Sequence, residues 1–572
     1  MSLFDAFPPI SPAEWQEKIT TDLKGKPLSR LDWHLPEGFT MPPFLTQEQT
    51  DLTAGGINSA PGAFPYRRGN FFNAIDQGWQ MVQDISVHQP AEAKARISEA
   101  LNAEIAAFRL YDWSETHNPA QLAEVLGAVD TRYHALHLSG SQDWVPTLAS
   151  YLERHSLEAN LLTGTFFGPE DQLSASLIDI LPSSPYFRTA GISVTGVDDA
   201  GGTAVHQLAF ALAKTVEEIQ AYGSAEGVFE KLAFHFPIGS HFLVEIAKFR
   251  AFRMLVARLA EVYEVEGHEA RSPFVVASTS RWNKTLYDAH NNLLRTTTEA
   301  MAAILGGAHA VNVRAFDVVK QAENAFSSRL ARNIQHLLKH EAYLSHVQDP
   351  AGGSYYLESL TDNLAETAWK LFQEIEQKGG YLTCQQDGTL ADWLRESREA
   401  KEKAIHHRKQ VFVGVNQYPD PQETYLEGKV PNGRGMAAFE QLRAKVDQLP
   451  QRPEAFLLMF GKPAMRSARA NFARNLLGAA GIMSKETTQL GSPRSAMLEA
   501  IETKAAIVVL CADDASYDEY ASQLADQLHT QLQEVTLLLA GRPEGWEGYG
   551  MDDCLYAGMD ALSFLTQLTQ SA

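Results

Sequence analysis

The sequence has few cysteines, no long apolar run and no excess of positive charge. Its 572 residues include three cysteines, Cys384, Cys511 and Cys554, an odd and widely spaced set that fits neither a disulfide framework nor a thiolate metal cluster. No stretch approaches the roughly 18 uninterrupted apolar residues of a membrane span, and the acidic, proline-containing N-terminus is unlike a secretory signal. These absences predict free thiols and a cytoplasmic location.

Positive charge is scarce, because 48 lysines and arginines face 70 aspartates and glutamates, for a formal net charge of −22. Such a chain repels phosphate backbones, so no nucleic acid partner is expected, although a local basic pocket for a small anion remains open. A phosphate-loop signature, an HExxH motif and dinucleotide-site glycine spacing are also missing. The pair His406-His407 indicates a solvated helix face rather than a metal site. Asp198-Asp199 fits either a general base or the N-cap of a helix starting near Thr203.

The chain is too long for one hydrophobic core, and its 45% apolar and 21% charged residues are typical of a globular protein with several domains. We predict an N-terminal arm over residues 1–60. Within it, residues 11–24 fit an amphipathic helix with Trp15, Ile19 and Leu23 on one face. An arm that is apolar on one side but outside any domain predicts contact with a partner.

Residues 61–385 alternate between short apolar runs and helical patterns. Strands are predicted at 80–87, 132–138, 159–163, 190–195, 273–278 and 308–313. Helices are predicted at 92–108, 119–127, 203–222, 242–263, 288–305, 325–340 and 361–379. This alternation favours a parallel sheet closed into a (β/α)8 TIM barrel, with an open doubly wound sheet as the alternative.

A second domain is expected after a charged, helix-prone linker at residues 386–452. Residues 453–572 again alternate. Strands are predicted at 454–460, 505–511 and 534–540, and helices at 466–480, 493–503, 515–531 and 559–569. This rhythm predicts a small doubly wound domain of the flavodoxin-like type, so the whole chain belongs to the α/β class.

Several long segments carry a family resemblance. They are PGAFPYRRG (61–69), KTLYDAHNNLLRTTTEAMAAILGGA (284–308), SSRLARNIQHLLKHE (327–341), DPAGGSYYLESLTDNLAETAWKLFQEIE (349–376) and VGVNQYP (413–419). In this order they resemble the methylmalonyl-CoA mutase family and cover most of the predicted barrel. The resemblance implies a (β/α)8 barrel followed by a flavodoxin-like cobalamin-binding domain, which agrees with the pattern of the residues themselves.

The resemblance also implies a cobalt ligand that this chain lacks. Active chains of the family carry D-x-H-x-x-G just after the first strand of the cobalamin domain, where the histidine binds cobalt and the aspartate supports it. The matching stretch places Pro463 at the aspartate, Met465 at the histidine and Ala468 at the glycine. We therefore expect this chain to contain no cofactor-binding and no metal-binding residues.

Two further elements of the active chains are replaced in the predicted barrel. The I-S-G-Y-H motif, whose histidine acts as a general acid near the thioester, is matched by residues 192–196, with Gly196 at the histidine position. The R-Q-Y motif, whose tyrosine separates substrate from corrin, is matched by Val82-Gln83-Asp84, with Asp84 at the tyrosine position. We therefore expect no catalytic residues, and a barrel axis filled by side chains instead of a pantetheine arm.

These replacements resemble the small, non-catalytic subunit of the heterodimeric bacterial isomerases in this family. The resemblance implies a homologous large subunit that binds adenosylcobalamin and acyl-CoA and interconverts methylmalonyl-CoA and succinyl-CoA. The alternatives are a homo-oligomeric interaction or regulatory protein on a retired mutase fold, and a divergent active acyl-CoA mutase. Residual CoA or cobalamin binding stays open, as does whether Arg67 and Arg68 bind an anion or form surface salt bridges.

Overall fold

The computed structural model describes residues 10–46, 48, 59–69, 78–113, 119–267, 273–321, 324–426, 428–488, 492–532 and 534–571. The chain forms two compact units. The first comprises the chain up to Ser280 with Thr296–Ala315 and Asn324–Ser397, and the second comprises Arg281–Arg295, Phe316–Glu323 and Arg398–Ala572. Within the described ranges, no helix is long and apolar enough to cross a membrane.

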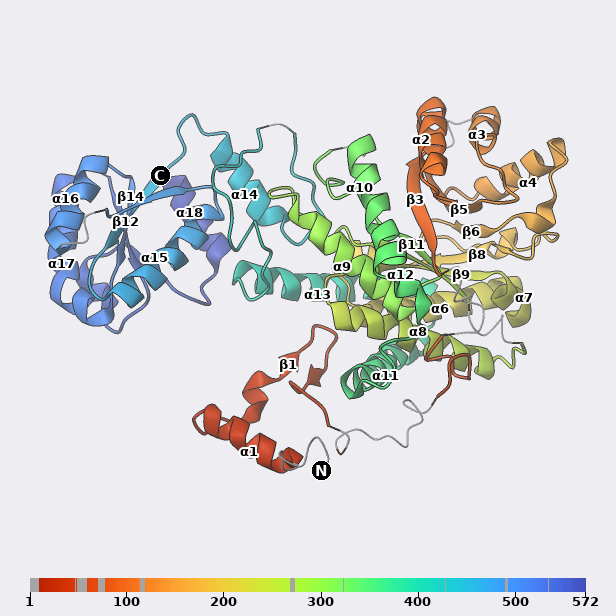
Figure 1. Cartoon of the computed structure of the whole chain (residues 1–572), viewed down its shortest axis with the longest axis horizontal. Helices are drawn as coiled ribbons and strands as arrows, with labels where there is room; N and C mark the ends of the chain where they lie inside the picture. The colour runs from red at the N-terminus through yellow and green to blue at the C-terminus, as the bar shows by residue number, and fades with distance from the viewer. Residues whose placement is uncertain are drawn as a thin grey trace, which may run out of the picture. The chain divides into compact units, whose positions relative to one another are not determined.

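The first unit is built around a parallel sheet that is nearly closed into a barrel (Figure 1). Its strands are β3 (Gln80–Ser86), β4 (Ala107–Trp113), β5 (Ala135–Gly140), β6 (Gly164–Phe167), β7 (Phe187–Arg188), β8 (Ala190–Ser193), β9 (Leu232–Ile238), β10 (Phe274–Thr279) and β11 (Ala310–Asn312). They pair in the order β7-β6-β5-β4-β3-β11-β10-β9-β8, so the first barrel strand, β3, pairs with the last, β11.

The remaining join of the barrel, between β6 and β8, depends on a glycine. A Cβ atom at Gly191 would lie 1.7 Å from the carbonyl oxygen of Phe166, so no residue with a side chain fits at this position. Glycine therefore lets the backbones of β6 and β8 approach each other closely. The predicted TIM-barrel class is confirmed, and the open doubly wound sheet is not the architecture of this unit.

Helices follow most of the barrel strands, and Figure 1 shows α2, α3 and α4 on the outer side of β3–β6. The helices of this part are α2 (Pro90–Asn102), α3 (Pro119–Leu126), α4 (Trp144–Arg154), α5 (Thr195–Asp199), α6 (Ala204–Tyr222), α7 (Ala225–Glu230), α8 (Phe242–Val262), α9 (Asn291–Gly306), α10 (Ala325–His336), α11 (Tyr355–Gln377), α12 (Tyr381–Gln386) and α13 (Thr389–His406). The N-cap of α6 is Thr203, so the interpretation of Asp198-Asp199 as that cap is wrong. Asp198 instead accepts a hydrogen bond from Ser280 Oγ at 2.5 Å.

The described N-terminal residues begin with a helix that packs little. Helix α1 (Pro12–Asp22) starts at Ser11, which exchanges capping hydrogen bonds with Glu14, and none of its side chains is buried. The ring of Trp15 lies 4.1 Å from that of Phe44. A 3-10 helix and a two-stranded antiparallel sheet follow, formed by η1 (Leu28–Leu31), β1 (Trp33–His34) and β2 (Thr40–Met41).

The second unit contains a five-stranded parallel sheet with helices on both faces (Figure 1). Its elements are α14 (Ala437–Asp447), β12 (Glu454–Met459), α15 (Pro463–Gly478), β13 (Met483–Glu486), α16 (Pro493–Thr503), β14 (Ile507–Cys511), α17 (Asp514–Gln531), β15 (Thr536–Ala540), β16 (Asp553–Leu555) and α18 (Ala561–Ser571). Alternate strand residues fill two cores, since Leu457 packs with α15 and α18 and Phe456 packs with α16 and α17. The strand order β13-β12-β14-β15-β16 is flavodoxin-like, as predicted.

Candidate functional site

A layer of polar side chains crosses the barrel axis. Alternate residues of a strand point to the same side, and the strand pairing brings inward-facing positions of neighbouring strands to similar levels. We call this set the polar layer. Its members are Asp84, Arg109, His137, Thr165, His235, Ser278 and Asn312.

An ion pair between Asp84 and Arg109 organises the polar layer. Nε and Nη2 of Arg109 donate to the two carboxylate oxygens of Asp84 at 2.6 and 2.5 Å, and Asn312 Nδ2 donates to Asp84 at 2.6 Å. Burial raises the pKa of Asp84, but the charge and hydrogen bonds of Arg109 outweigh it and hold the pKa below its usual value. Asp84 is therefore an ionised, fully engaged carboxylate at the position where the resemblance expects a tyrosine.

The two histidines of the polar layer are neutral. His137 Nδ1 lies 2.9 Å from Thr165 Oγ1, and His235 Nε2 lies 2.7 Å from Ser278 Oγ. Burial, together with the positive charge of Arg109, lowers the pKa of His137 to about 3. The same causes hold the pKa of His235 well below its ordinary value.

Apolar side chains fill the axis next to the polar layer. Most of them lie two residues before a member of that layer, on the side of the amino ends of the strands. This apolar cluster consists of Val82, Ala107, Ala135, Phe167, Ala233, Val276 and Ala310. A cavity of about 490 Å³ opens at the amino ends of β3–β5, and Ala107 and Ala135 line it as well. Beyond that level, side chains of the apolar cluster and the polar layer lie along the barrel axis.

Gly196, at the predicted histidine position, lies against a carboxylate from another loop. Its backbone N–H donates to Glu170 Oε1 at 2.8 Å. A Cβ atom at Gly196 would lie 2.3 Å from Glu170 Oε2. A histidine therefore cannot occupy this position unless Glu170 moves away.

The segment that carries Glu170 is fastened to helix α6. Lys214 Nζ donates to the Glu170 carbonyl at 2.8 Å, and the Glu218 carboxylate accepts from the Ser174 N–H at 2.7 and 3.0 Å. Burial raises the pKa of Glu170 and Glu218 and lowers that of Lys214. These contacts fix the segment after β6 across the carboxyl end of β8, where a TIM barrel usually carries its reactive groups.

The predicted cobalt-ligand segment is helical in this chain. Helix α15 begins at Pro463, a residue favoured at the first helical position because it lacks an N–H. Met465 therefore lies in the first turn of α15, where 45% of its surface is exposed. Pro463 has neither an N–H nor a polar side chain that could donate a hydrogen bond to a ligand.

Other side chains occupy the carboxyl edge of the small sheet. Arg469 donates to the Ala512 carbonyl and to Asp514, and its guanidinium carbon lies 4.9 Å from the centre of the Tyr517 ring. The Tyr517 hydroxyl bonds to the carbonyls of Leu510 and Ala540 at 2.9 and 2.8 Å. Among the described residues, no three His, Cys, Asp or Glu side chains gather as a metal site. The residues of this edge do not fit a ligated cobalamin.

Arg67 and Arg68 belong to a network of ion pairs, much of it buried. Arg67 Nη1 lies 2.8 Å from Glu358 and Arg67 also pairs with Asp362, while Arg68 Nε lies 3.1 Å from Asp349. Arg250, which is fully buried, contacts both Asp349 and Glu358. The two arginines therefore fasten the segment 61–69 to α11 and its preceding turn. They form salt bridges, as one alternative expected, but Arg67 does so in the interior.

Most residues of the site were not predicted from the sequence, among them Arg109, Glu170 and Asn312. A signal existed for Arg109, because a charged residue inside the apolar run AFRLYDW requires a buried partner of opposite charge. Glu170 lies in ordinary polar surroundings of the sequence, whereas Asn312 stands between Val311 and Val313 in a predicted strand. Only the closure of the barrel brings them to Gly196 and Asp84.

Comparison with known proteins gives consistent results. The family model described as methylmalonyl-CoA mutase matches residues 163–455. The methylmalonyl-CoA mutase small subunit of Porphyromonas gingivalis is 32% identical over 95% of this chain and 93% of its own length. A probable small subunit from Mycobacterium bovis is 29% identical over 89% of this chain and 88% of its own. The methylmalonyl-CoA mutase of Rhizobium meliloti is 26% identical over 87% of this chain and 76% of its own.

Proposed function

Because this chain belongs to the methylmalonyl-CoA mutase family, we propose that it is the small subunit of a heterodimeric methylmalonyl-CoA mutase, an isomerase. The observation that carries this conclusion is the similarity to small subunits over nearly the whole chain. The enzyme interconverts methylmalonyl-CoA and succinyl-CoA. No observation favours a homo-oligomeric regulatory protein on the same fold.

The subunit itself is non-catalytic in this proposal. Asp84 is engaged by Arg109 instead of facing a substrate, Glu170 covers the backbone of Gly196, and Met465 is an exposed residue of α15. The apolar cluster and the polar layer occupy the axis along which the family resemblance expects a pantetheine arm. Three separate elements of the reaction are therefore replaced by groups that stabilise the fold.

A homologous large subunit supplies the chemistry in this proposal. The family uses adenosylcobalamin, and we assign its binding, together with that of acyl-CoA, to the large subunit in the cytoplasm. The small subunit supports assembly, with the arm predicted at residues 1–60 as a contact segment. Obligate interfaces of such heterodimers are usually large and apolar, which suits a helix that buries no side chain and exposes Trp15.

Separate and joint purification tests this proposal. The chain purified alone should show no mutase activity and no corrin absorbance after incubation with adenosylcobalamin and gel filtration. Co-expression with the large subunit should give a one-to-one complex with activity. Stoichiometric cobalamin on the isolated chain, or activity without the large subunit, would overturn the non-catalytic assignment.

A further inference from the structure

Helix α10 and the turn that continues it carry apolar side chains on two opposite faces. The inner face contacts β3, and its buried side chains include Ala331 and Ile334. The outer face repeats at the helical spacing i, i+4, i+7 and i+11 and consists of Phe326, Leu330, Asn333 and Leu337. Phe326 is 62% exposed and Leu337 is 48% exposed. Because a helix at the surface of a monomer normally has a polar outer face, the second apolar face indicates that a partner covers it.

The end of this helix is irregular and also presents apolar groups to the surface. Helix α10 continues as a π-helical turn, η6 (Leu337–Glu341), and the 3-10 turn η7 (Leu344–His346) follows. Tyr343 between them has a φ of 54°, a left-handed conformation that is unfavourable for a bulky side chain. Its side chain is 59% exposed, and that of Val347 is 62% exposed. π-Helical turns and strained residues gather at functional sites, which indicates a role for this segment beyond the fold of its own chain.

The area of these side chains suits a stable protein–protein contact. We call them the α10 surface, and its apolar members are Phe326, Leu330, Leu337, Tyr343 and Val347. Its two aromatic side chains alone expose about 240 Å², taking about 200 Å² for a whole aromatic side chain. One partner contributes about 800 Å² to a standard interface, and a little over half of that area is apolar. The aromatic side chains therefore supply about half of the apolar area that such an interface needs.

Positive charge surrounds the α10 surface, although the whole chain has a net charge of −22. Residues 325–341 contain three lysines and arginines against a single acid, Glu341. Arg332 pairs with Glu99, but as far as the structure describes the chain, Arg329 and Lys339 form no ion pair. A two-fold contact between two copies would place this surface against itself and bring like charges together. A different protein, with carboxylates around an apolar centre, avoids this repulsion.

We propose that the α10 surface is the contact site for the large subunit. The large subunit covers Leu337 and Tyr343 with apolar side chains and places carboxylates beside Arg329 and Lys339. The inference rests on the proposed function for the identity of the partner, and it names the part of this chain that binds that partner. It is distinct from the predicted contact of residues 1–60, because the two share no residue.

Binding measurements between the purified large subunit and variants of the full-length chain test this proposal. Leu337→Glu and Tyr343→Ala should each weaken association at least about tenfold, as expected for side chains at the centre of an interface. Both residues are exposed, so the unfolding temperature of each variant should match that of the parent chain. Arg329→Glu should also weaken association, and the loss should shrink at high salt because salt screens the new repulsion.

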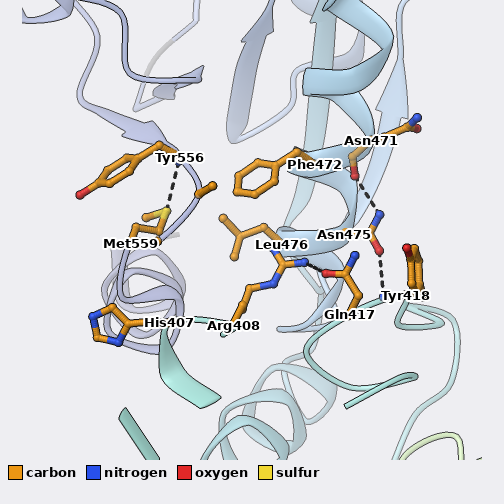
Figure 2. A pocket seen from close by; sticks show the side chains of 12 residues that line it. His407, Arg408, Gln417, Tyr418, Asn471, Phe472, Asn475, Leu476, Tyr556 and Met559 are labelled. Carbon is orange, nitrogen blue, oxygen red and sulfur yellow. Dashed lines mark hydrogen bonds between the residues drawn. The ribbon is translucent and has the colours of Figure 1, made fainter. Parts of the chain in front are cut away.

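Tyr418 provides a matched control in the second unit. It is likewise an exposed tyrosine in the left-handed region, at 66% exposure and a φ of 52°, and it stands at the rim of a pocket of about 580 Å³ (Figure 2). Tyr418→Ala should bind the large subunit as the parent chain does. Arg494→Glu, at an exposed position on α16, is the control for the reversal of charge. Amide hydrogen exchange adds a measurement without variants, because residues 337–347 should exchange more slowly in the complex than in the isolated chain.

The outcomes separate a failure of this inference from a failure of the proposed function. If the parent chain binds the large subunit and Leu337→Glu and Tyr343→Ala bind equally well, only the assignment of the α10 surface is overturned. The same holds if Tyr418→Ala weakens association as much as Tyr343→Ala, or if the exchange of residues 337–347 does not change. If the parent chain forms no complex, the proposed function fails together with this inference. Self-association of the isolated chain that Leu337→Glu abolishes would identify a second copy as the occupant and overturn the proposal.

Discussion

Asp84 and Arg109 carry opposite charges in a barrel interior where few water molecules reach them. Two hydrogen bonds join the Arg109 guanidinium to the Asp84 carboxylate, and Asn312 donates a third hydrogen bond to that carboxylate. The pair links β3 to β4 at the position where the family resemblance expects a tyrosine. Under the proposed function, a stabilising contact therefore takes the place of an active-site residue.

The substitution Asp84→Asn should destabilise the barrel strongly. It leaves the Arg109 guanidinium charged and buried without a counterion, which costs about 3 kcal/mol or more. Hydrogen exchange of the β3 and β4 amides, or chemical denaturation followed by tryptophan fluorescence, measures the change. The matched control Glu366→Gln, which breaks the exposed pair with Lys370 on α11, should have little effect. Wild-type stability of Asp84→Asn would contradict the structural role of the pair.

Acid should destabilise the first unit because its interior histidines stay neutral. The pKa values of His137 and His309 are lowered to about 3 by burial and nearby arginines, whereas a histidine in the unfolded chain titrates near 6.5. Between these values the unfolded chain binds more protons, so the free energy of unfolding falls as the pH decreases. Asp84, whose pKa is lowered, keeps its contribution above about pH 4 and loses it only at lower pH.

Denaturation curves between pH 7 and pH 4.5 measure this effect. The loss approaches about 1.4 kcal/mol per pH unit for each such histidine. His137→Gln should flatten the pH dependence by about one proton, whereas His155→Gln, at an exposed position, should leave it unchanged. Equal slopes for His137→Gln and the parent chain would show that His137 does not stay neutral in the fold.

At the scale of elements, helix α15 decides what the small sheet can bind. It begins directly at Pro463, and Arg469 reaches from its second turn across the edge to Ala512 and Asp514. A cobalt-binding histidine needs both an imidazole at the right height and free space above the sheet. In this chain Met465 stands at the position matched to that histidine, and the Arg469 side chain lies along the edge.

Restoring the motif residues should therefore not restore cofactor binding. We expect Pro463→Asp/Met465→His/Ala468→Gly to fold but to show no stoichiometric corrin absorbance after gel filtration, because Arg469 still occupies the edge. Adding Arg469→Ala opens that space and distinguishes a missing ligand from a blocked site. Tight binding by the triple variant alone would show that the edge is open in solution.

Four barrel strands, β4, β6, β7 and β9, were not predicted from the sequence. The strand predicted at 159–163 is wrong, because residues 159–161 form a 3-10 helix and β6 begins only at Gly164. The reasons are clearest for β4 and β9. In β4 the run AFRLYDW contains a charged residue and continues the helical spacing of α2, so the helix was extended to residue 108. In β9 the run LAFHFPI contains His235 and Pro237, which usually weaken a strand prediction. Burial of His235 against Ser278 makes the strand possible, and that contact exists only after the barrel forms.

At the scale of the whole molecule, the N-terminal helix packs little on the residues that the structure describes. No side chain of α1 is buried, and Trp15 retains 45% exposure although it contacts Phe44. A capped helix that buries nothing gains little stability from its own chain. Its preservation is explained if the apolar side packs on the large subunit.

Deletion of residues 2–26 should leave the unfolding temperature of the isolated chain unchanged and weaken association with the large subunit at least about tenfold. Sedimentation equilibrium or surface plasmon resonance measures the association. Trp15→Ala should reproduce part of the loss, whereas Leu498→Ala, which removes another exposed apolar side chain on α16, should not. Unchanged association after the deletion would exclude α1 from the interface.

The sequence alone determines the fold class, the two domain types and the family, through its hydrophobic periodicity and the order of its motifs. The α/β class, the barrel, the flavodoxin-like domain and the family follow from local patterns, because burial repeats every second residue in a strand and every third or fourth in a helix. Motif matching from the sequence also predicts that Asp84, Gly196, Pro463 and Met465 stand at functional positions of the family, and that prediction rests on residue type alone.

Only the tertiary structure decided what took the place of the lost groups. Asp84 meets Arg109, Gly196 meets Glu170 and Arg67 meets Glu358, and each of these contacts joins residues on different elements. The grouping of residues 281–295 with the C-terminal unit likewise depends on contacts between segments that are distant in the sequence. The spacing of residues in the sequence does not determine such contacts, because they form only when the barrel closes and the loops pack against it.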